Sequence, residues 1–270
     1  DFDADGITST ALLTQGLAKL GGNVYPYIPH RFEEGYGLNS TALRHLSQTG
    51  ATLVVTVDCG ITSVAEVERA RELGMDVIIT DHHSVPSRLP PAFASVNPKR
   101  QDSSYPFRDL AGVGVAFKLL QALSQTMGRE DILEEHPFLD LVALGTVADV
   151  TSLVGENRYL VKRGLDALSS TERLGIREML ALAGLDKGKV DTESISYILG
   201  PRINATGRLE HAIASYRLLV TSSPEEAKRL AAQLEETNLE RQKLTNEALA
   251  RAREELSGLG NDPIIIVGSA

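Results

Sequence analysis

Two short, uninterrupted apolar runs constrain the fold of this chain more than any other feature of its sequence. Residues 53–57 (LVVTV) and 77–80 (VIIT) are typical of parallel strands that are buried on both faces. They alternate with helix-like stretches at 8–20, 39–46 and 63–73, where Asn39 is placed to cap the second stretch and Gly74 to end the third. With strand-like runs at 24–28 and 94–96, this alternation predicts an α/β fold with a doubly wound, mostly parallel sheet.

Beyond residue 110 the pattern changes to helices, which we expect at 114–127, 138–148, 158–167 and 194–199. Ser223, Pro224 and the two acids after them are a strong start signal for a long helix that runs to about residue 256. We therefore predict an α/β catalytic domain at 1–150, a helical extension at 151–222 and a connecting helix at 223–257. Residues 258–270, with a strand-like run at 263–268, would begin a second domain that lies largely outside this sequence.

Acidic residues and histidines stand after the strand-like runs 53–57 and 77–80, just ahead of the first predicted helix, and at the end of the apolar run 141–148. Because ligand sites in parallel α/β sheets lie at the carboxyl ends of the strands, we expect these side chains to converge. Carboxylates crowded into one crevice repel each other, and a pair of hard divalent cations removes that penalty. Oxygen ligands with one or two imidazoles favour Mn²⁺ or Mg²⁺. The candidates are Asp1, Asp3, Asp5, Asp58, Asp81, His82, His83 and Asp149.

Each of these residues also has an ordinary structural interpretation. A single aspartate after a strand is usually a turn or helix cap, and adjacent histidines are more often surface residues than ligands. The spacing of Asp1, Asp3 and Asp5 also resembles a calcium loop, but the twelfth position is Leu12 rather than the required glutamate. Caps alone do not readily explain four such clusters at successive segment ends, so the joint pattern favours a metal site.

Composition adds only weak constraints. The net charge of −9 argues against a nucleic-acid partner, but two bound cations would restore about four positive charges where a phosphate must lie. The single cysteine, Cys59, permits no internal disulfide and fits a reducing cytoplasm. No apolar run approaches the roughly 18 residues of a membrane span, so we expect a cytoplasmic protein with no membrane contact.

Four short motifs resemble those of the DHH phosphoesterase superfamily. They are DADG at 3–6, VDCG at 57–60, DHH at 81–83 and AD at 148–149. Four longer stretches are similar to the RecJ-type exonucleases within that superfamily: RFEEGYGL at 31–38, LAGVGVAF at 110–117, LVALGTVAD at 141–149 and GPRINATGRL at 200–209. Cys59 stands where that family usually has asparagine, and a core role is the simplest account of its thiol.

The resemblance implies roles for the motif residues. Asp3 would bind one metal ion, Asp5 the other, and Asp58 would bridge both. His82 and Asp149 would complete the shell of the second ion. The resemblance further makes Asp1 a weaker ligand candidate, places His83 near the scissile phosphate, and has Asp81 orient an imidazole. Asp58, His82 and His83 are thus the expected catalytic residues.

The resemblance also implies hydrolysis of single-stranded DNA from the 5′ end to 5′-mononucleotides, in DNA repair and recombination. The protein would be monomeric, with a single-strand-binding protein and a helicase as possible partners. Arginine forks suit a terminal phosphate, so Arg31 is the first candidate for the substrate site. We rank a second set next, with the alternative that Arg202 only ties helices to the sheet; the set is Arg202, Asn204 and Arg208.

Three questions stay open at the level of sequence. Gly112 and Gly114 precede a predicted helix, where they either cradle a phosphate or allow close packing. The chain is alternatively a DHH hydrolase of short oligonucleotides, cyclic dinucleotides or pyrophosphate. It is less readily a non-catalytic replication scaffold, because every motif retains residues that can bind metal.

Overall fold

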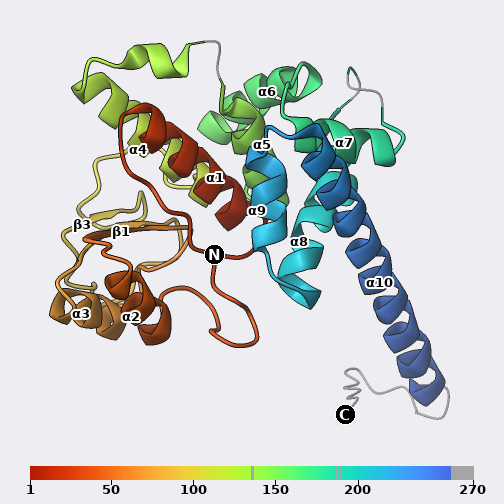
Figure 1. Ribbon diagram of the computed structural model, residues 1–270, viewed down its shortest axis with the longest axis horizontal. Coiled ribbons are helices and arrows are strands. Elements are labelled where there is room, and N and C mark those ends of the chain that lie inside the picture. The colour runs from red at the N-terminus through yellow and green to blue at the C-terminus, as the bar shows by residue number, and fades with distance from the viewer. Residues whose placement is uncertain (135–136, 186–187, 189, 257–270) are drawn as a thin grey trace.

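The computed structural model describes residues 1–134, 137–185, 188 and 190–256, and its strands form a small parallel sheet at the left of Figure 1. Its strands β1 (Leu53–Val57), β2 (Asp76–Thr80) and β3 (Ala94–Val96) are hydrogen-bonded in the order β1-β2-β3. The register pairs Val55 with Ile78, and Ile79 with Ser95. The apolar runs are therefore strands, and the predicted parallel sheet is confirmed.

Helices cover both faces of this sheet. Figure 1 shows α1 (Ala4–Lys19) and α4 (Gly112–Thr126) on one face, and α2 (Ser40–Gln48) and α3 (Val64–Glu72) on the other. Side chains that alternate along the strands join two separate apolar clusters: Val57 packs with α1 and α4, whereas Val77 and Ile79 pack with α2 and α3. The sheet is thus doubly wound, as the sequence predicts.

Local signals end several of these helices as expected. The Asn39 side chain accepts a hydrogen bond from the Ala42 amide at 2.7 Å and so caps α2. Gly74, two residues past the end of α3, has a φ of 78°, a left-handed conformation that favours glycine. These helix boundaries are therefore fixed by residues close to them in the chain.

The rest of the described chain is helical and surrounds the buried helix α5. In chain order the elements are η1 (Glu130–Leu133), α5 (Leu139–Ala148), α6 (Gly155–Ser169), α7 (Leu174–Leu182), the π-helix η3 (Ser194–Leu199), α8 (Gly200–Leu209), α9 (Ile213–Val220) and α10 (Pro224–Leu256). Every residue of α5 from Leu139 to Val147 is buried. Since α5 packs against α1, α4 and α6, it is held in one position relative to the sheet.

One arginine links α5 to three other parts of the fold. Arg173 Nε donates to the buried carboxylate of Asp140 on α5 at 2.8 Å. Its Nη1 donates to Gln15 Oε1 of α1 at 2.8 Å and to the carbonyl of Leu219 in α9 at 3.1 Å, and its Nη2 to the carbonyl of Pro137 at 3.0 Å. These hydrogen bonds fix the amino-terminal end of α5, opposite to the end that Asp149 follows.

Several local expectations are wrong. Residues 24–28 form no strand, because Pro26 lacks the N–H that a ladder needs, and Tyr25 is largely exposed. The segment 200–209, to which the sequence assigned no helix, is the helix α8, and helices α7 and α9 were not delimited within the predicted helical extension. The first helix begins at Ala4 rather than Thr8, so Asp5 lies in its first turn. β1 is buried only toward its carboxyl end, since Leu53 is half exposed.

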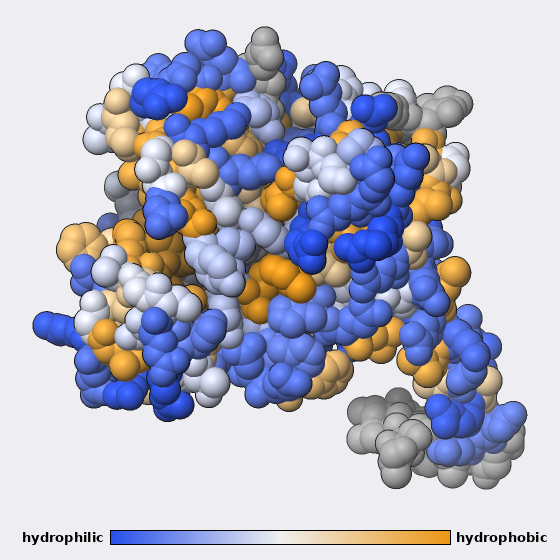
Figure 2. Space-filling view, in the orientation of Figure 1, coloured by the Kyte–Doolittle hydropathy of each residue, from blue (hydrophilic) through white to orange (hydrophobic). Residues whose placement is uncertain are grey.

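The long helix α10 begins at Pro224 and extends to Leu256, as predicted. Its first half packs against α7, α8 and α9 through the buried side chains of Ala227, Leu230 and Leu234. From Leu239 onward most of its side chains are exposed, and Figure 2 shows this projecting part at the lower right as mainly hydrophilic. Within the described residues, no helix combines the length and the apolar character that a membrane span requires.

Candidate metal centre

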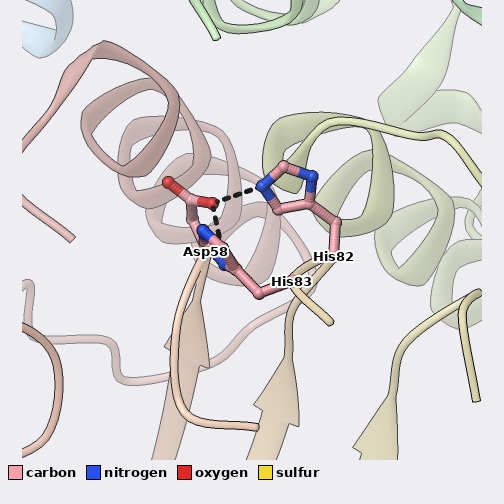
Figure 3. A group of neighbouring side chains, drawn as sticks. All are labelled: Asp58, His82 and His83. Atoms are coloured by element: carbon pink, nitrogen blue, oxygen red, sulfur yellow. Dashed lines mark ion pairs between the residues drawn. The ribbon is translucent and has the colours of Figure 1, made fainter. Parts of the chain in front are cut away.

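Acidic and histidine side chains meet at the carboxyl ends of β1 and β2. Asp58 follows β1 directly, His82 and His83 follow β2 after one residue, and the three point toward one another (Figure 3). The Nε2 atom of His82 lies 3.0 Å from Asp58 Oδ1. It also lies 3.9 Å from Asp5 Oδ2 and 3.8 Å from Asp149 Oδ2. Three carboxylates from distant parts of the chain therefore surround one imidazole nitrogen.

The atoms that could bind a metal form three overlapping groups, and within each group all the ligand atoms lie within 4.8 Å of one another. Asp58 belongs to two groups and His82 to two, so the groups share members and lie side by side. The groups are Asp58–His82–His83, Asp5–His82–Asp149 and Asp1–Asp3–Asp58. Every residue proposed from the sequence as a metal ligand is therefore in this one crevice, and the pattern offers room for more than one ion.

Asp58 is held in an unusual backbone conformation. Its φ is 57°, and in the described chain only Val150 shares a positive φ among residues other than glycine. The Tyr36 hydroxyl donates to the Asp58 carbonyl at 3.0 Å, and the Asp58 amide donates to the Thr80 carbonyl at 3.0 Å. Strained residues of this kind are common at functional sites. Tyr36 is a support that the motif analysis did not single out.

Asp5 is fixed by the beginning of helix α4. Its Oδ2 accepts a hydrogen bond from the Gly112 amide at 2.6 Å, and its Oδ1 accepts one from the Val113 amide at 2.8 Å. The amides at this helix terminus are thus occupied by a protein carboxylate. This arrangement supports close packing rather than a phosphate cradle at Gly112–Gly114.

Asp81 orients the second histidine. Its Oδ1 lies 2.7 Å from His83 Nδ1 and accepts hydrogen bonds from the amides of His82 and His83, and its Oδ2 accepts one from Ile61. Although burial by itself would raise the pKa of Asp81, these hydrogen bonds outweigh burial and lower the pKa. The hydrogen bond to Asp81 in turn raises the pKa of His83. The pair favours a protonated His83 whose side chain is 47% exposed.

Without a cation the centre is electrostatically unfavourable. Burial, followed by repulsion from neighbouring carboxylates, raises the pKa of Asp5 and that of Asp58 well above the usual range. Burial also raises the pKa of Asp149; His82 opposes this effect, and Asp3 adds a smaller contribution that raises the pKa. Asp58 Oδ1 and both ring nitrogens of His82 are buried without a hydrogen-bond partner among the described residues. Unpaired oxygen and imidazole donors beside crowded carboxylates fit a divalent cation.

The remaining motif residues are not members of these ligand groups. Arg31 is exposed and lies over the ring of Phe2, with 5.1 Å from its guanidinium carbon to the ring centre. Asn204 Oδ1 accepts a hydrogen bond from the Ala4 amide at 2.7 Å, which ties α8 to the first motif. Arg202 donates to Glu235 of α10 and to the Ile198 carbonyl, so it joins helices to one another, whereas the alternative interpretation had it tie helices to the sheet.

A small cavity of about 120 Å³ lies beside the first motif and the end of α5. Its lining includes Ala148, Asn204, Arg208 and Arg241. Arg241, on α10, was not proposed from the sequence because no motif surrounds it. Cys59, which follows Asp58, is buried and forms no disulfide.

Comparison with known proteins gives a consistent picture. Residues 1–146 match the DHH family, N-terminal domain. The "Single-stranded-DNA-specific exonuclease RecJ" of Bacillus subtilis is 45% identical over 99% of this chain and 33% of its own length. The protein of the same name from Escherichia coli is 41% identical over 96% of this chain and 48% of its own length. The chain therefore spans only a third to a half of these curated relatives.

A solved structure supports the same relationship. "Crystal structure of exonuclease RecJ bound to manganese" superposes with a TM-score of 0.83 and 38% sequence identity, over 93% of this chain and 63% of that one. The fold of the part compared is thus shared.

Proposed function

Because the chain belongs to the DHH family, we propose that it is the catalytic core of a metal-dependent exonuclease that degrades single-stranded DNA from its 5′ end to 5′-mononucleotides. The convergence of carboxylates and imidazoles from four chain segments in one crevice carries this proposal. The names of the similar proteins supply the substrate and the reaction class.

Two Mn²⁺ or Mg²⁺ ions are the proposed cofactors. Manganese is the ion named for the similar solved structure, and the ligand atoms here suit either metal. We assign Asp3 to one ion and Asp5 to the other, with Asp58 between them, and His82 and Asp149 to the second ion; Asp1 is a further candidate. When bound, such ions neutralise the carboxylates, activate water for attack on phosphorus and stabilise the charge that develops there.

The protein side chains would orient the phosphodiester for this attack. Asp81 holds His83 through Nδ1, which leaves Nε2 of the half-exposed ring available to the scissile phosphate, where the resemblance places this histidine. Hydrolysis adds water to phosphorus and breaks the bond to the 3′ oxygen, which leaves as a hydroxyl.

The 5′ polarity requires a residue that recognises a terminal phosphate. Arg31 is our first candidate, because its guanidinium is exposed and lies over the ring of Phe2. Phe2 in turn stands between Asp1 and Asp3 in the sequence. Arg208 and Asn204 line the neighbouring cavity and come next. Arg202 ranks last, since Glu235 already engages it.

A comparison of end chemistry tests the first candidate. Arg31→Ala should weaken binding of 5′-phosphorylated strands much more than binding of 5′-hydroxyl strands. Arg44→Ala removes an exposed arginine from α2 and serves as the matched control. Equal losses on the two kinds of end would remove Arg31 from this role.

The decisive experiment for the function follows 5′-labelled and 3′-labelled single strands during digestion by the full-length protein with Mn²⁺. We expect labelled mononucleotide to appear at once from the 5′ label and late from the 3′ label, and no digestion by Asp58→Asn. Faster turnover of dinucleotides or cyclic dinucleotides than of long strands would favour the oligonucleotide hydrolase. Metal binding without any hydrolysis would favour the scaffold.

Further parts of the proposal rest on the resemblance and the sequence. We assign residues 1–150 to the catalytic domain, 151–222 to its helical extension and 223–257 to the connecting helix. Residues 258–270, proposed to start the next domain, lie outside the described residues. A monomer in the cytoplasm, with a role in DNA repair and recombination and with single-strand-binding protein or a helicase as partners, completes the proposal.

A further inference from the structure

Gly112 contacts two of the proposed metal-binding aspartates at once. Its amide donates to Asp5 Oδ2 at 2.6 Å. A Cβ atom added to Gly112 would lie 2.7 Å from Asp58 Oδ1 and 2.7 Å from Asp58 Cβ. We propose that Gly112 is a positioning residue of the metal centre, which fixes Asp5 by its amide and leaves space for Asp58 by having no side chain. This inference rests on the proposed function in that it requires cations to bind here.

The lack of space for a side chain, rather than the backbone conformation, explains why residue 112 is glycine. Gly112 is the first residue of α4, and its φ does not lie in the left-handed region. Any residue can adopt such a backbone, so its conformation alone gives no reason for glycine. The distances to Asp58 give that reason, because carbon and oxygen atoms that are not bonded do not approach to 2.7 Å without displacement.

Asp58 cannot easily move away from an added methyl group. Its carbonyl accepts the Tyr36 hydroxyl, its amide donates to the Thr80 carbonyl, and its φ of 57° lies in a narrow allowed region. A displaced carboxylate would leave its position 3.0 Å from His82 Nε2. If α4 moved instead, the amides that hold Asp5 would move with it. Either response disturbs a proposed ligand.

Gly114 provides a matched control in the same helix. A Cβ atom there would meet only Leu110, at 3.2 Å from its Cδ2 and 3.4 Å from its Cβ. The end of a leucine side chain can adjust by a few tenths of an ångström, and no proposed metal ligand is involved. Gly114→Ala therefore adds the same atom without the same consequence.

The test measures metal binding rather than DNA hydrolysis. Isothermal titration with Mn²⁺, and electron paramagnetic resonance of the bound ions, would compare the parent protein with Gly112→Ala and Gly114→Ala. We expect Gly112→Ala to raise the Mn²⁺ dissociation constant at least tenfold and to alter the resonance spectrum, with less than a twofold change for Gly114→Ala. Parent-like Mn²⁺ affinity in Gly112→Ala, or a parent that binds no Mn²⁺, would overturn the proposal.

A suppressor separates positioning from general packing. Asp58→Gly removes the atoms that the new methyl group would meet, and glycine tolerates the positive φ at this position. If Gly112→Ala unfolds more readily in EDTA, adding Asp58→Gly should restore the denaturation midpoint of Asp58→Gly alone. Failure to restore it shows that Gly112 serves helix packing, against the proposal. A parent that binds Mn²⁺ but cleaves no DNA would refute the function and leave this inference intact.

Discussion

Replacing Asp58 by asparagine should make the protein more stable without metal and less stable with it. The Asp58 carboxylate is buried, and its Oδ1 has no hydrogen-bond partner among the described residues. Asparagine keeps the shape, tolerates a φ of 57° and can donate from Nδ2 to His82 Nε2, which lies 3.0 Å from the present Oδ1. The same change removes the carboxylate that is shared between the ligand groups.

The two effects have comparable magnitudes. A buried, unpaired polar group destabilises a protein by about 1–3 kcal/mol, so the variant should gain roughly that much in EDTA. Mn²⁺ at about a thousand times its dissociation constant stabilises the parent by about 4.1 kcal/mol per site, and the variant should receive little of this. The order of the two proteins should therefore reverse when Mn²⁺ is added.

The pH dependence has a definite sign. Because the folded-state pKa of Asp58 is raised, the folded parent binds more protons than the unfolded chain above the ordinary carboxyl pKa. The contribution of Asp58 to the stability of the metal-free parent consequently falls as the pH rises toward the folded-state pKa. The advantage of the asparagine variant in EDTA should grow over the same interval.

Guanidinium denaturation followed by circular dichroism measures both effects, in EDTA and in Mn²⁺. Asp76→Asn, at the exposed start of β2, removes one negative charge away from the centre and should change stability by less than about 0.5 kcal/mol in either condition. A variant at Asp58 that is less stable than the parent in EDTA, or equally stabilised by Mn²⁺, would refute this reasoning.

Three further substitutions test single contacts. Asp81→Asn should lower the pKa of His83, which NMR measures in the metal-free protein. In the parent, the pair stabilises the fold below the unfolded-state pKa of histidine, and this stabilisation is lost as the pH rises through the folded-state pKa. The variant should lack this contribution. Tyr36→Phe should lower the free energy of unfolding by about 0.5–1.5 kcal/mol in urea, because only the hydrogen bond to Asp58 is lost. Arg173→Met should lower it by about 3–5 kcal/mol in guanidinium, because a buried carboxylate loses its partner.

Each of these has a contrary outcome. An unchanged His83 titration would mean that Asp81 does not control the ring. A loss above about 3 kcal/mol in Tyr36→Phe would mean that the hydroxyl does more than hold one carbonyl. Arg177→Met, an exposed arginine on the same helix, should change stability little, and a loss equal to that of Arg173→Met would contradict the assigned contacts.

The parts of the fold that local sequence determines were predictable. The strand at residues 53–57 and the helix caps at Asn39 and Ser223 depend on nearby residues, so their signals survive without tertiary information. Helix α8 contains two glycines and a proline, all poor helix formers. It is helical because it packs against α10 and η3, which the sequence alone does not reveal.

The candidate site likewise has residues that the sequence predicts and residues that only the fold reveals. Sequence predicts the residues that follow strands, because parallel sheets place ligand sites there; these are Asp58, Asp81, His82 and His83. Asp1, Asp3 and Asp5 lie at the start of α1 and Asp149 follows α5, so these were predicted from motif resemblance. Their supports were not, since the Gly112 amide lies 107 residues from Asp5 and the Tyr36 hydroxyl 22 residues from Asp58. Arg202 is another example, because only the fold shows that Glu235 engages it.

The distance between Asp5 and α4 along the chain also affects how the protein matures. The first aspartates leave the ribosome well before the amides of Gly112 and Val113 that hold Asp5, by 107 and 108 residues. At about 5–20 residues per second, this interval lasts on the order of 5–20 s. During it the nascent acidic segment lacks these anchors, and His82 is made only in the later part of the interval. The proposed ion site therefore cannot be complete before synthesis has reached Asp149, the last of its proposed ligands.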